Sequence, residues 1–213
     1  MRSHRRPRAA VAYRRRGPTR QPYDLVLIVC EGQKTEPNYL QALRATYALS
    51  SVNIRIISPS ASDPLSIVKF AIREIRDSEY DRAFCVFDRD QHTNFDQAIG
   101  AIQQSRAGKA GRLIPITSTP CFELWLLLHF RYSNAPFTRT GNNSACDMAI
   151  NELKAHFPDY TKGRRTVFME LTSRIEGAIN NAKRLEKDNE TSGSNNPATQ
   201  IHALIHYLMN VKK

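Results

Sequence analysis

Short apolar runs predict four strands in the first half of the chain. Residues 25–30 (LVLIVC) and 82–87 (RAFCVF) are runs typical of strands that are buried on both faces of a parallel sheet. Residues 52–57 (VNIRII) alternate like a further strand. Residues 112–116 (RLIPI) form the fourth, in which Pro115 favours an edge position.

Helices are predicted between these strands. One begins at Glu36, with Thr35 as its cap. The next runs from Pro64 to about residue 77 with Asp63 as its cap, and a third spans 95–105. Strands that alternate with helices predict an α/β fold, with an open parallel sheet of about four strands flanked by helices.

The rest of the chain is predicted to be helical. The expected helices span residues 123–130, 145–156, 166–186 and 197–209, with a polar loop over 188–196. We therefore expect an α/β domain over residues 23–120. Residues 121–213 would form a helical extension that packs on the same domain.

Residues 1–22 have a different composition and are expected to be a disordered basic arm. Residues 1–20 contain eight arginines and no acid, while the formal net charge of the whole chain is +11. Such an arm attracts nucleic-acid phosphates without reading their sequence. A solubilising tail and a docking segment for an acidic partner protein are the alternatives.

Composition limits the location of the protein. Mean hydropathy is −0.49, and the densest apolar run, residues 124–130, is too short to cross a bilayer. No apolar stretch follows the basic N-terminus, so we expect a cytoplasmic protein without a secretory signal. The four cysteines (Cys30, Cys85, Cys121 and Cys146) form no CxxC pair, which favours reduced thiols over a zinc ribbon or a disulfide scaffold.

Acidic residues follow two of the predicted strands. Glu31 comes directly after the first strand, and Asp88 and Asp90 come directly after the third. In an extended chain residues i and i+2 point the same way, so both aspartates can face one point. Clustered carboxylates stay ionised together where a cation compensates them, and oxygen ligands select Mg²⁺ or Mn²⁺. The alternatives are helix-capping acids, or acids neutralised by Arg89.

Several strings together resemble known families. The string EGQKTE, with a later strand that ends in DRD, resembles a Toprim domain of the type found in OLD-family nucleases. The strings VCEGQKTEPNYL, VFDRDQH, PCFELWLLLHF and NPATQIHALIHYL, spread over residues 29–208, resemble the RloB-like family.

The resemblance implies roles for five acids. Glu31 matches the Toprim glutamate, a general acid or base or a metal ligand, and Asp88 and Asp90 match the catalytic pair of metal ligands. Glu36 matches a second glutamate that would serve a second metal. Glu123 resembles a later acidic motif. The resemblance also implies phage defence beside an ATPase of the ABC or AAA type.

Basic residues are candidates for substrate binding. Lys34 lies in the loop after the first strand, and Lys162, Arg164 and Arg165 form a cluster after Pro158. Each could bind a substrate phosphate or stabilise transition-state charge. Plain surface charge is the alternative for each of them.

Other polar and reactive residues are given structural interpretations. His92 is either a metal or proton-transfer residue or, more simply, a loop residue near the acids. Trp125 and His129 are four residues apart on one apolar helix, which favours core packing. Cys121 has no evident base beside it, so we interpret it as a small buried side chain rather than a nucleophile.

The predicted function is that of a Mg²⁺- or Mn²⁺-dependent nuclease that cuts DNA, tRNA or another RNA in bacterial antiviral defence, acting as a monomer or a homo-oligomer. The alternative is a non-catalytic nucleic-acid-binding or regulatory subunit of an ATPase-containing defence complex. The chain has no Walker A string, so it is not itself a P-loop ATPase. Nucleotidyl transfer ranks last because no nucleotide-binding string supports it.

Overall fold

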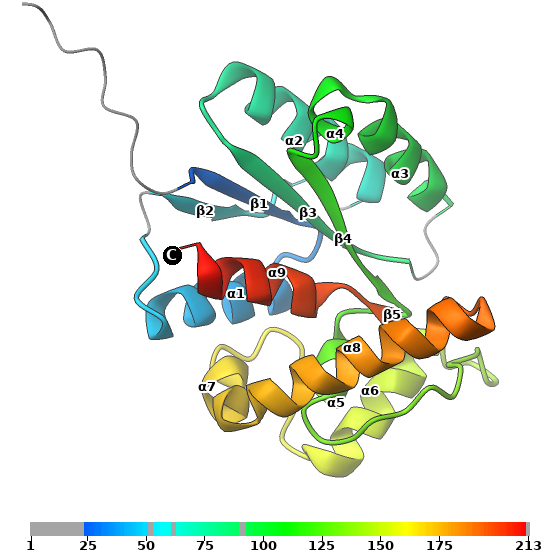
Figure 1. The fold of residues 1–213 in the computed structure, drawn as a ribbon. Coiled ribbons are helices and arrows are strands. Elements are labelled where there is room, and N and C mark those ends of the chain that lie inside the picture. The colour runs from blue at the N-terminus through cyan, green and yellow to red at the C-terminus, as the bar shows by residue number, and fades with distance from the viewer. Residues whose placement is uncertain (1–23, 51–52, 61–62, 90–92, 212–213) are drawn as a thin grey trace, which may run out of the picture.

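The computed structural model describes residues 24–50, 53–60, 63–89 and 93–211, so the basic arm lies outside the described residues. In the described part, five strands form one sheet in the order β2-β1-β3-β4-β5 (Figure 1). The strands are β1 (Val26–Cys30), β2 (Ile54–Ile57), β3 (Arg82–Asp88), β4 (Leu113–Thr119) and β5 (Ala198–Thr199). Strands β1 to β4 are parallel, and β5 is antiparallel to β4. The predicted α/β fold with an open parallel sheet is confirmed.

The sheet separates two apolar cores. Along β1, Val26, Ile28 and Cys30 belong to one core, and Leu27 and Val29 belong to the other. Both faces are covered by helices (Figure 1): on one side α2 (Pro64–Asp77), α3 (Phe95–Gln104) and α4 (Arg106–Lys109), and on the other α1 (Thr35–Thr46) and α9 (Ile201–Asn210). Because both faces are buried, β1 is a continuous apolar run.

The predicted start of α2 is confirmed, whereas that of α1 is corrected. The Asp63 carboxylate accepts a hydrogen bond from the backbone N–H of Ser66 over 3.1 Å, and Pro64 is the first helical residue. Helix α1 begins at Thr35, one residue earlier than predicted, and Thr35 is not its cap. The Thr35 hydroxyl instead accepts a hydrogen bond from the N–H of Gly163 over 3.0 Å, a partner 128 residues away.

Strand β4 extends three residues beyond its predicted end, and Pro115 lies where it has one neighbouring strand. Cys85 of β3 is paired with Pro115, whereas β5 pairs only with Ser118 and Thr119. Pro115 cannot donate a hydrogen bond, so it is tolerated where no strand of the described part of the chain lies on the other side of β4. The edge position predicted for Pro115 therefore holds locally, although β4 as a whole is not the last strand.

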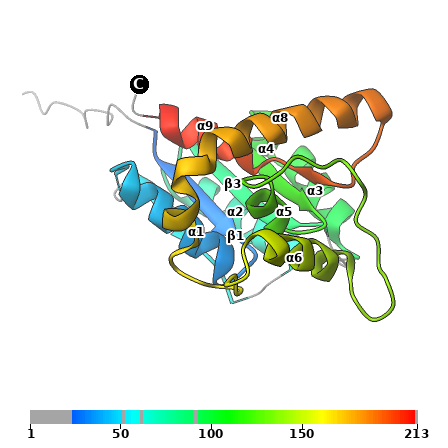
Figure 2. The same cartoon turned by 90° about the horizontal axis from the view of Figure 1, so that it is seen from below.

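The helices after β4 differ from the prediction in several places. They are α5 (Glu123–Leu127), α6 (Ala145–His156), α7 (Val167–Leu171), a 3-10 turn (Thr172–Arg174) and α8 (Ile175–Ser192). Helix α6 has its predicted bounds, and it lies beside α5 (Figure 2). Helix α5 ends three residues before its predicted end, and the single helix predicted over 166–186 is divided by the 3-10 turn.

The prediction of a polar loop over 188–196 is largely wrong. Helix α8 continues to Ser192 and ends at Gly193, whose φ of 70° is in the left-handed region that favours glycine. The helix predicted over 197–209 starts later, at Ile201, because Ala198 and Thr199 pair with β4 instead. No helix in the described ranges is both long and apolar enough to cross a membrane.

The prediction of reduced thiols is wrong for two of the four cysteines. Cys121 and Cys146 form a disulfide, with Cα atoms 5.6 Å apart. Cys30 and Cys85 are free and buried in the sheet. The sequence gives no sign of this pairing, because 25 residues separate the two partners and the packing of α5 against α6 brings them together.

Candidate functional site

Four carboxylates from separate elements line one cavity at the carboxyl edge of the sheet. The cavity has a volume of about 480 Å³. Its acids are Glu31, Glu36, Asp88 and Glu123, and Lys34 and Lys162 also line it. Neighbouring parallel strands end at the same edge, so β1 and β3 deliver Glu31 and Asp88 to the same place.

A hydrogen bond connects Glu31 to the end of β3. The backbone N–H of Asp88 donates to Glu31 Oε2 over 3.1 Å. The N–H of Glu31 donates to the carbonyl oxygen of Val86 over 2.9 Å, which continues the pairing of β1 and β3 by one residue. The Glu31 side chain is buried. These two bonds hold its carboxylate beside Asp88.

Glu36 lies in the first turn of α1 and is buried. Burial raises its pKa from 4.5 to about 7, and the negative charges of Glu123 and Glu31 add to this shift. Hydrogen bonding to its own backbone N–H and the charge of Lys162 act in the opposite direction. A carboxyl group with this pKa is partly protonated at neutral pH.

Asp88 is the last residue of β3 and is partly exposed. Desolvation raises its pKa well above the usual range, and the negative charges of Glu36, Glu123 and Glu31 raise it further. Its predicted partner Asp90, like His92, lies outside the described residues. The structure therefore places four of the five predicted acids around one cavity.

Glu123, the first residue of α5, is held by two groups from another loop. Its Oε1 accepts a hydrogen bond from the hydroxyl of Tyr160 over 2.8 Å and lies 3.9 Å from Lys162 Nζ. Tyr160 is buried, and the sequence analysis missed it because nothing local marks a loop tyrosine as a neighbour of a glutamate 37 residues away. Tyr160 fixes the direction of the Glu123 carboxylate.

The loop that carries Lys162 is tied to α1. The side-chain amide of Asn38 donates to the carbonyl oxygen of Gly163 over 2.8 Å, next to the bond between Gly163 and Thr35. Gly163 has a φ of 80°, and a Cβ atom there would lie 2.9 Å from Lys34 Cβ. This close approach of two loops brings Lys34 and Lys162 to the same cavity.

The other two members of the predicted basic cluster do not line this cavity. The Arg164 guanidinium pairs with Glu170 over 2.8 Å and lies 5.5 Å from the centre of the Phe157 ring. Arg165 is exposed outside the cavity lining. The cluster divides because Gly163 turns the chain after Lys162, so adjacent residues face different surroundings.

Trp125 and His129 are core residues, as predicted. Both are buried, and His129 Nδ1 lies 3.0 Å from the carbonyl oxygen of Trp125. Burial lowers the pKa of His129 to about 4, so the ring is neutral at physiological pH. The hydroxyl of Tyr39 lies 3.4 Å from its other ring nitrogen.

The acids of the cavity fit a hydrated hard cation. Their donors are all oxygen atoms, as Mg²⁺ and Mn²⁺ prefer, and their mutual repulsion would be relieved by a bound cation. Among the described residues, the one group of three ligand atoms within 4.8 Å of one another is Cys121, Glu123 and Cys146, not a set of these carboxylates. Mg²⁺ usually keeps several waters and binds through one or two carboxylates, so the wider spacing suits a hydrated ion.

Comparison with known proteins identifies the family. No curated protein and no solved structure matches the chain. The model of the family described as RloB-like protein matches residues 26–208. This range includes strands β1 and β3 and all four carboxylates of the cavity. Since the match covers most of the sequence, this chain belongs to the RloB-like family.

Proposed function

We propose that this protein is a Mg²⁺-dependent nuclease, with Mn²⁺ as an alternative ion, that cleaves DNA or RNA in bacterial antiviral defence. The observation that carries the proposal is the convergence of Glu31, Glu36, Asp88 and Glu123 on one cavity that also contains two lysines. The resemblance of these motifs to Toprim domains of OLD-family nucleases supports the same chemistry.

The acids of the cavity would have different roles in this reaction. Glu31 and Asp88, with Asp90 beyond the described residues, would hold the ion, and Glu123 offers a further oxygen ligand. A bound Mg²⁺ supplies polarisation of the scissile phosphate and lowers the pKa of a water molecule. The bond from the Asp88 N–H to Glu31 keeps the two ligands together before any substrate binds.

Glu36 is the candidate proton carrier. A pKa of about 7 is close to the pH at which an enzyme works, where a group can both accept and return a proton. Glu36 would take the proton of the attacking water and return it to the leaving oxygen. This use agrees with its buried position at the start of α1.

Basic residues on both sides of Asp88 would bind the phosphate backbone. Lys34 and Lys162 line the acidic cavity, and a second cavity of about 420 Å³ is lined by Arg89 and Arg139. Arg89 directly follows Asp88, so consecutive residues of the chain line the two cavities. A nucleic-acid strand could contact both, with the basic arm adding sequence-independent affinity.

The second candidate function is nucleic-acid binding without cleavage, as a regulatory subunit beside an ABC- or AAA-type ATPase. The arginine-lined cavity favours this alternative, because it can bind phosphates without any catalytic acid. The two functions differ in their need for a metal: cleavage requires it, and phosphate binding by arginine does not.

The test is cleavage of DNA and of total tRNA by the full chain with Mg²⁺, with Mn²⁺ and with EDTA. It is run with and without a co-expressed ABC- or AAA-type ATPase. We expect divalent-dependent cleavage that falls by about 100-fold or more in Glu31→Gln and Asp88→Asn. Glu176→Gln, an exposed change on α8 outside the cavity lining, should cleave like the wild type.

Two results would overturn this proposal. One is full cleavage by Asp88→Asn, which would place the chemistry outside this cavity. The other is tight, metal-independent nucleic-acid binding with no cleavage under any condition, including the presence of the ATPase. This second result would favour the regulatory subunit.

A further inference from the structure

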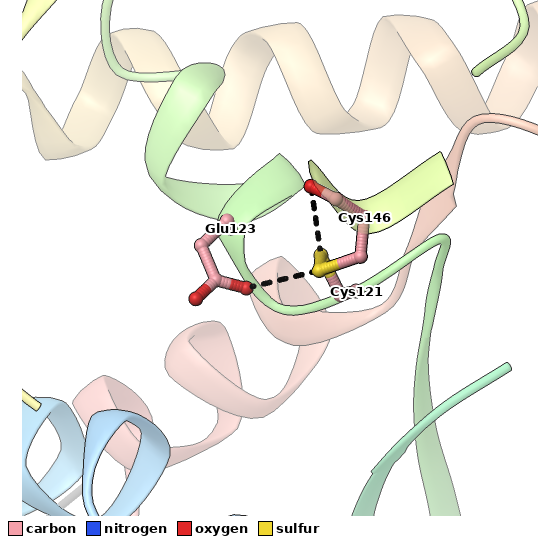
Figure 3. A group of neighbouring side chains, drawn as sticks. All are labelled: Cys121, Glu123 and Cys146. Atoms are coloured by element: carbon pink, nitrogen blue, oxygen red, sulfur yellow. Dashed lines mark hydrogen bonds between the residues drawn. A yellow bond between two sulfur atoms is a disulfide. The ribbon is translucent and has the colours of Figure 1, made fainter. Parts of the chain in front are cut away.

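Two sulfur atoms and one carboxylate form a compact cluster beside the acidic cavity. One ligand atom from each of Cys121, Glu123 and Cys146 lies within 4.8 Å of the other two (Figure 3). Cys146 Sγ lies 3.8 Å from Glu123 Oε2. All three residues are buried, yet Glu123 also lines the cavity, so the cluster borders space that a solvent molecule can reach.

The fold builds this cluster from two separate segments. Cys121 lies in the turn that joins β4 to α5, Glu123 is the first residue of α5, and Cys146 is the second residue of α6. The start of α6 is fixed by a capping box, in which the Ser144 hydroxyl accepts from the N–H of Asp147 and the Asp147 carboxylate accepts from the N–H of Ser144. The position of Cys146 at the start of α6 is therefore set by backbone structure as well as by the sulfur bond.

The two oxygens of Glu123 face different partners. Oε1 receives the Tyr160 hydroxyl, and Oε2 is directed toward the sulfur atoms (Figure 3). A hydrogen bond that orients a carboxylate in this way is typical of metal-ligand residues. Lys162 Nζ lies 3.9 Å from Cys146 Sγ, where its positive charge would stabilise a thiolate.

We propose that, in the reduced protein, Cys121, Cys146 and Glu123 bind one thiophilic divalent cation of the Zn²⁺ class. Thiolates select Zn²⁺ over Mg²⁺, so the site differs in chemistry from the all-oxygen site of the proposed nuclease, although Glu123 borders both. Three protein ligands leave a fourth position of a tetrahedral ion for water from the cavity. This inference does not depend on nuclease activity.

The disulfide and the metal site are alternative states of the same sulfur atoms. A phosphine reductant and water convert the disulfide into two thiols and a phosphine oxide. The divalent ion then displaces one proton from each thiol and binds two thiolates and the Glu123 carboxylate. Binding of the ion is therefore excluded in the oxidised protein.

The test is titration of the full chain with Co²⁺, used as a coloured substitute for Zn²⁺, after reduction by a phosphine in the absence of air. We expect one equivalent to produce thiolate-to-cobalt charge-transfer absorption and the ligand-field bands of a four-coordinate ion. Zn²⁺ should then displace Co²⁺ and abolish the colour. The oxidised protein should give neither band.

Variants identify the ligands. Cys146→Ser should lower the affinity for Co²⁺ by at least about tenfold and reduce the charge-transfer intensity, whereas Cys85→Ala, which removes a buried thiol in the opposite core, should change neither. Glu123→Gln keeps both thiols and should weaken binding without abolishing the charge-transfer band. A separate measurement on the wild type avoids any folding defect: Zn²⁺ should protect two of the four thiols from alkylation.

Three outcomes would overturn the proposal. They are the absence of charge-transfer absorption in the reduced wild type, equal binding by Cys146→Ser, and protection of no thiol by Zn²⁺. None of these measurements depends on nuclease activity. Failure of the metal-binding proposal is therefore distinguishable from failure of the proposed nuclease function.

Discussion

The carboxylate of Glu36 lies so close to the backbone of Gly32 that a Cβ atom at Gly32 would be 2.0 Å from Glu36 Oε2. The two residues are four apart, in the turn that leads from β1 into α1. No side chain fits between them while the Glu36 carboxylate keeps its place. Gly32 therefore provides the space that this carboxylate occupies in the cavity.

Replacing Gly32 by alanine should displace the Glu36 carboxylate. The obstacle is the end of a flexible side chain rather than backbone, so we expect a loss of no more than about 1 kcal/mol in unfolding free energy. Cleavage should fall by about tenfold or more, because the proton carrier has moved. Denaturant unfolding and cleavage rates, measured on the same protein, check the two expectations.

Gly177→Ala is the matched control for this glycine. Gly177 lies inside α8, and a Cβ atom there would have no neighbour within 4 Å. Alanine should raise the unfolding free energy by about 0.5–1 kcal/mol through its higher helix propensity, and it should leave cleavage unchanged. Equal activity loss in both variants would contradict a specific role of Gly32.

Stability should fall with rising pH because of Glu36. Its pKa is about 7 in the folded protein against a usual value of 4.5, so between these pH values the folded state binds a proton that the unfolded chain has lost. Relative to Glu36→Gln, the metal-free wild type should have the same unfolding free energy at pH 4 and a lower one at pH 8, by an amount on the order of 3 kcal/mol. Urea unfolding across this range measures the difference, and parallel curves would refute it.

Tyr160→Phe should destabilise the protein by about 1–3 kcal/mol. The change removes the hydroxyl that donates to Glu123 Oε1 and leaves a buried carboxylate oxygen with one donor fewer. Tyr207→Phe is the matched control, because the Asp24 carboxylate that it contacts is 42 % exposed and water can replace the lost bond. Denaturation midpoints should therefore shift much more for Tyr160 than for Tyr207.

Lys162→Met should weaken nucleic-acid binding. If Lys162 contacts one phosphate, its loss should reduce the slope of log affinity against log salt concentration by about 1. Arg164→Met, in the same loop but paired with Glu170 outside the cavity, should leave the slope unchanged. Fluorescence anisotropy in EDTA measures both variants, and equal slopes for Lys162→Met and the wild type would remove Lys162 from the interface.

Local features of the chain could be predicted well. The four parallel strands, the start of α2 at the Asp63 cap and the bounds of α6 all follow from apolar periodicity and from capping residues. The approach of Glu31 to Asp88 was also predictable, because carboxyl ends of neighbouring parallel strands meet at one edge. The concentration of positive charge in residues 1–20 can likewise be read directly from the sequence.

Contacts between distant segments could not be predicted in this way. The disulfide between Cys121 and Cys146, the bond from Tyr160 to Glu123 and the pairing of β5 with β4 join residues that are 25 to 81 positions apart. Helix propensity and periodicity describe the neighbourhood of one residue along the chain, so they predict elements but not the partners of an element. Packing of α5 against α6, and of the C-terminal segment along β4, decided which groups surround Glu123, because burial in a shared core brings together side chains that no local pattern relates.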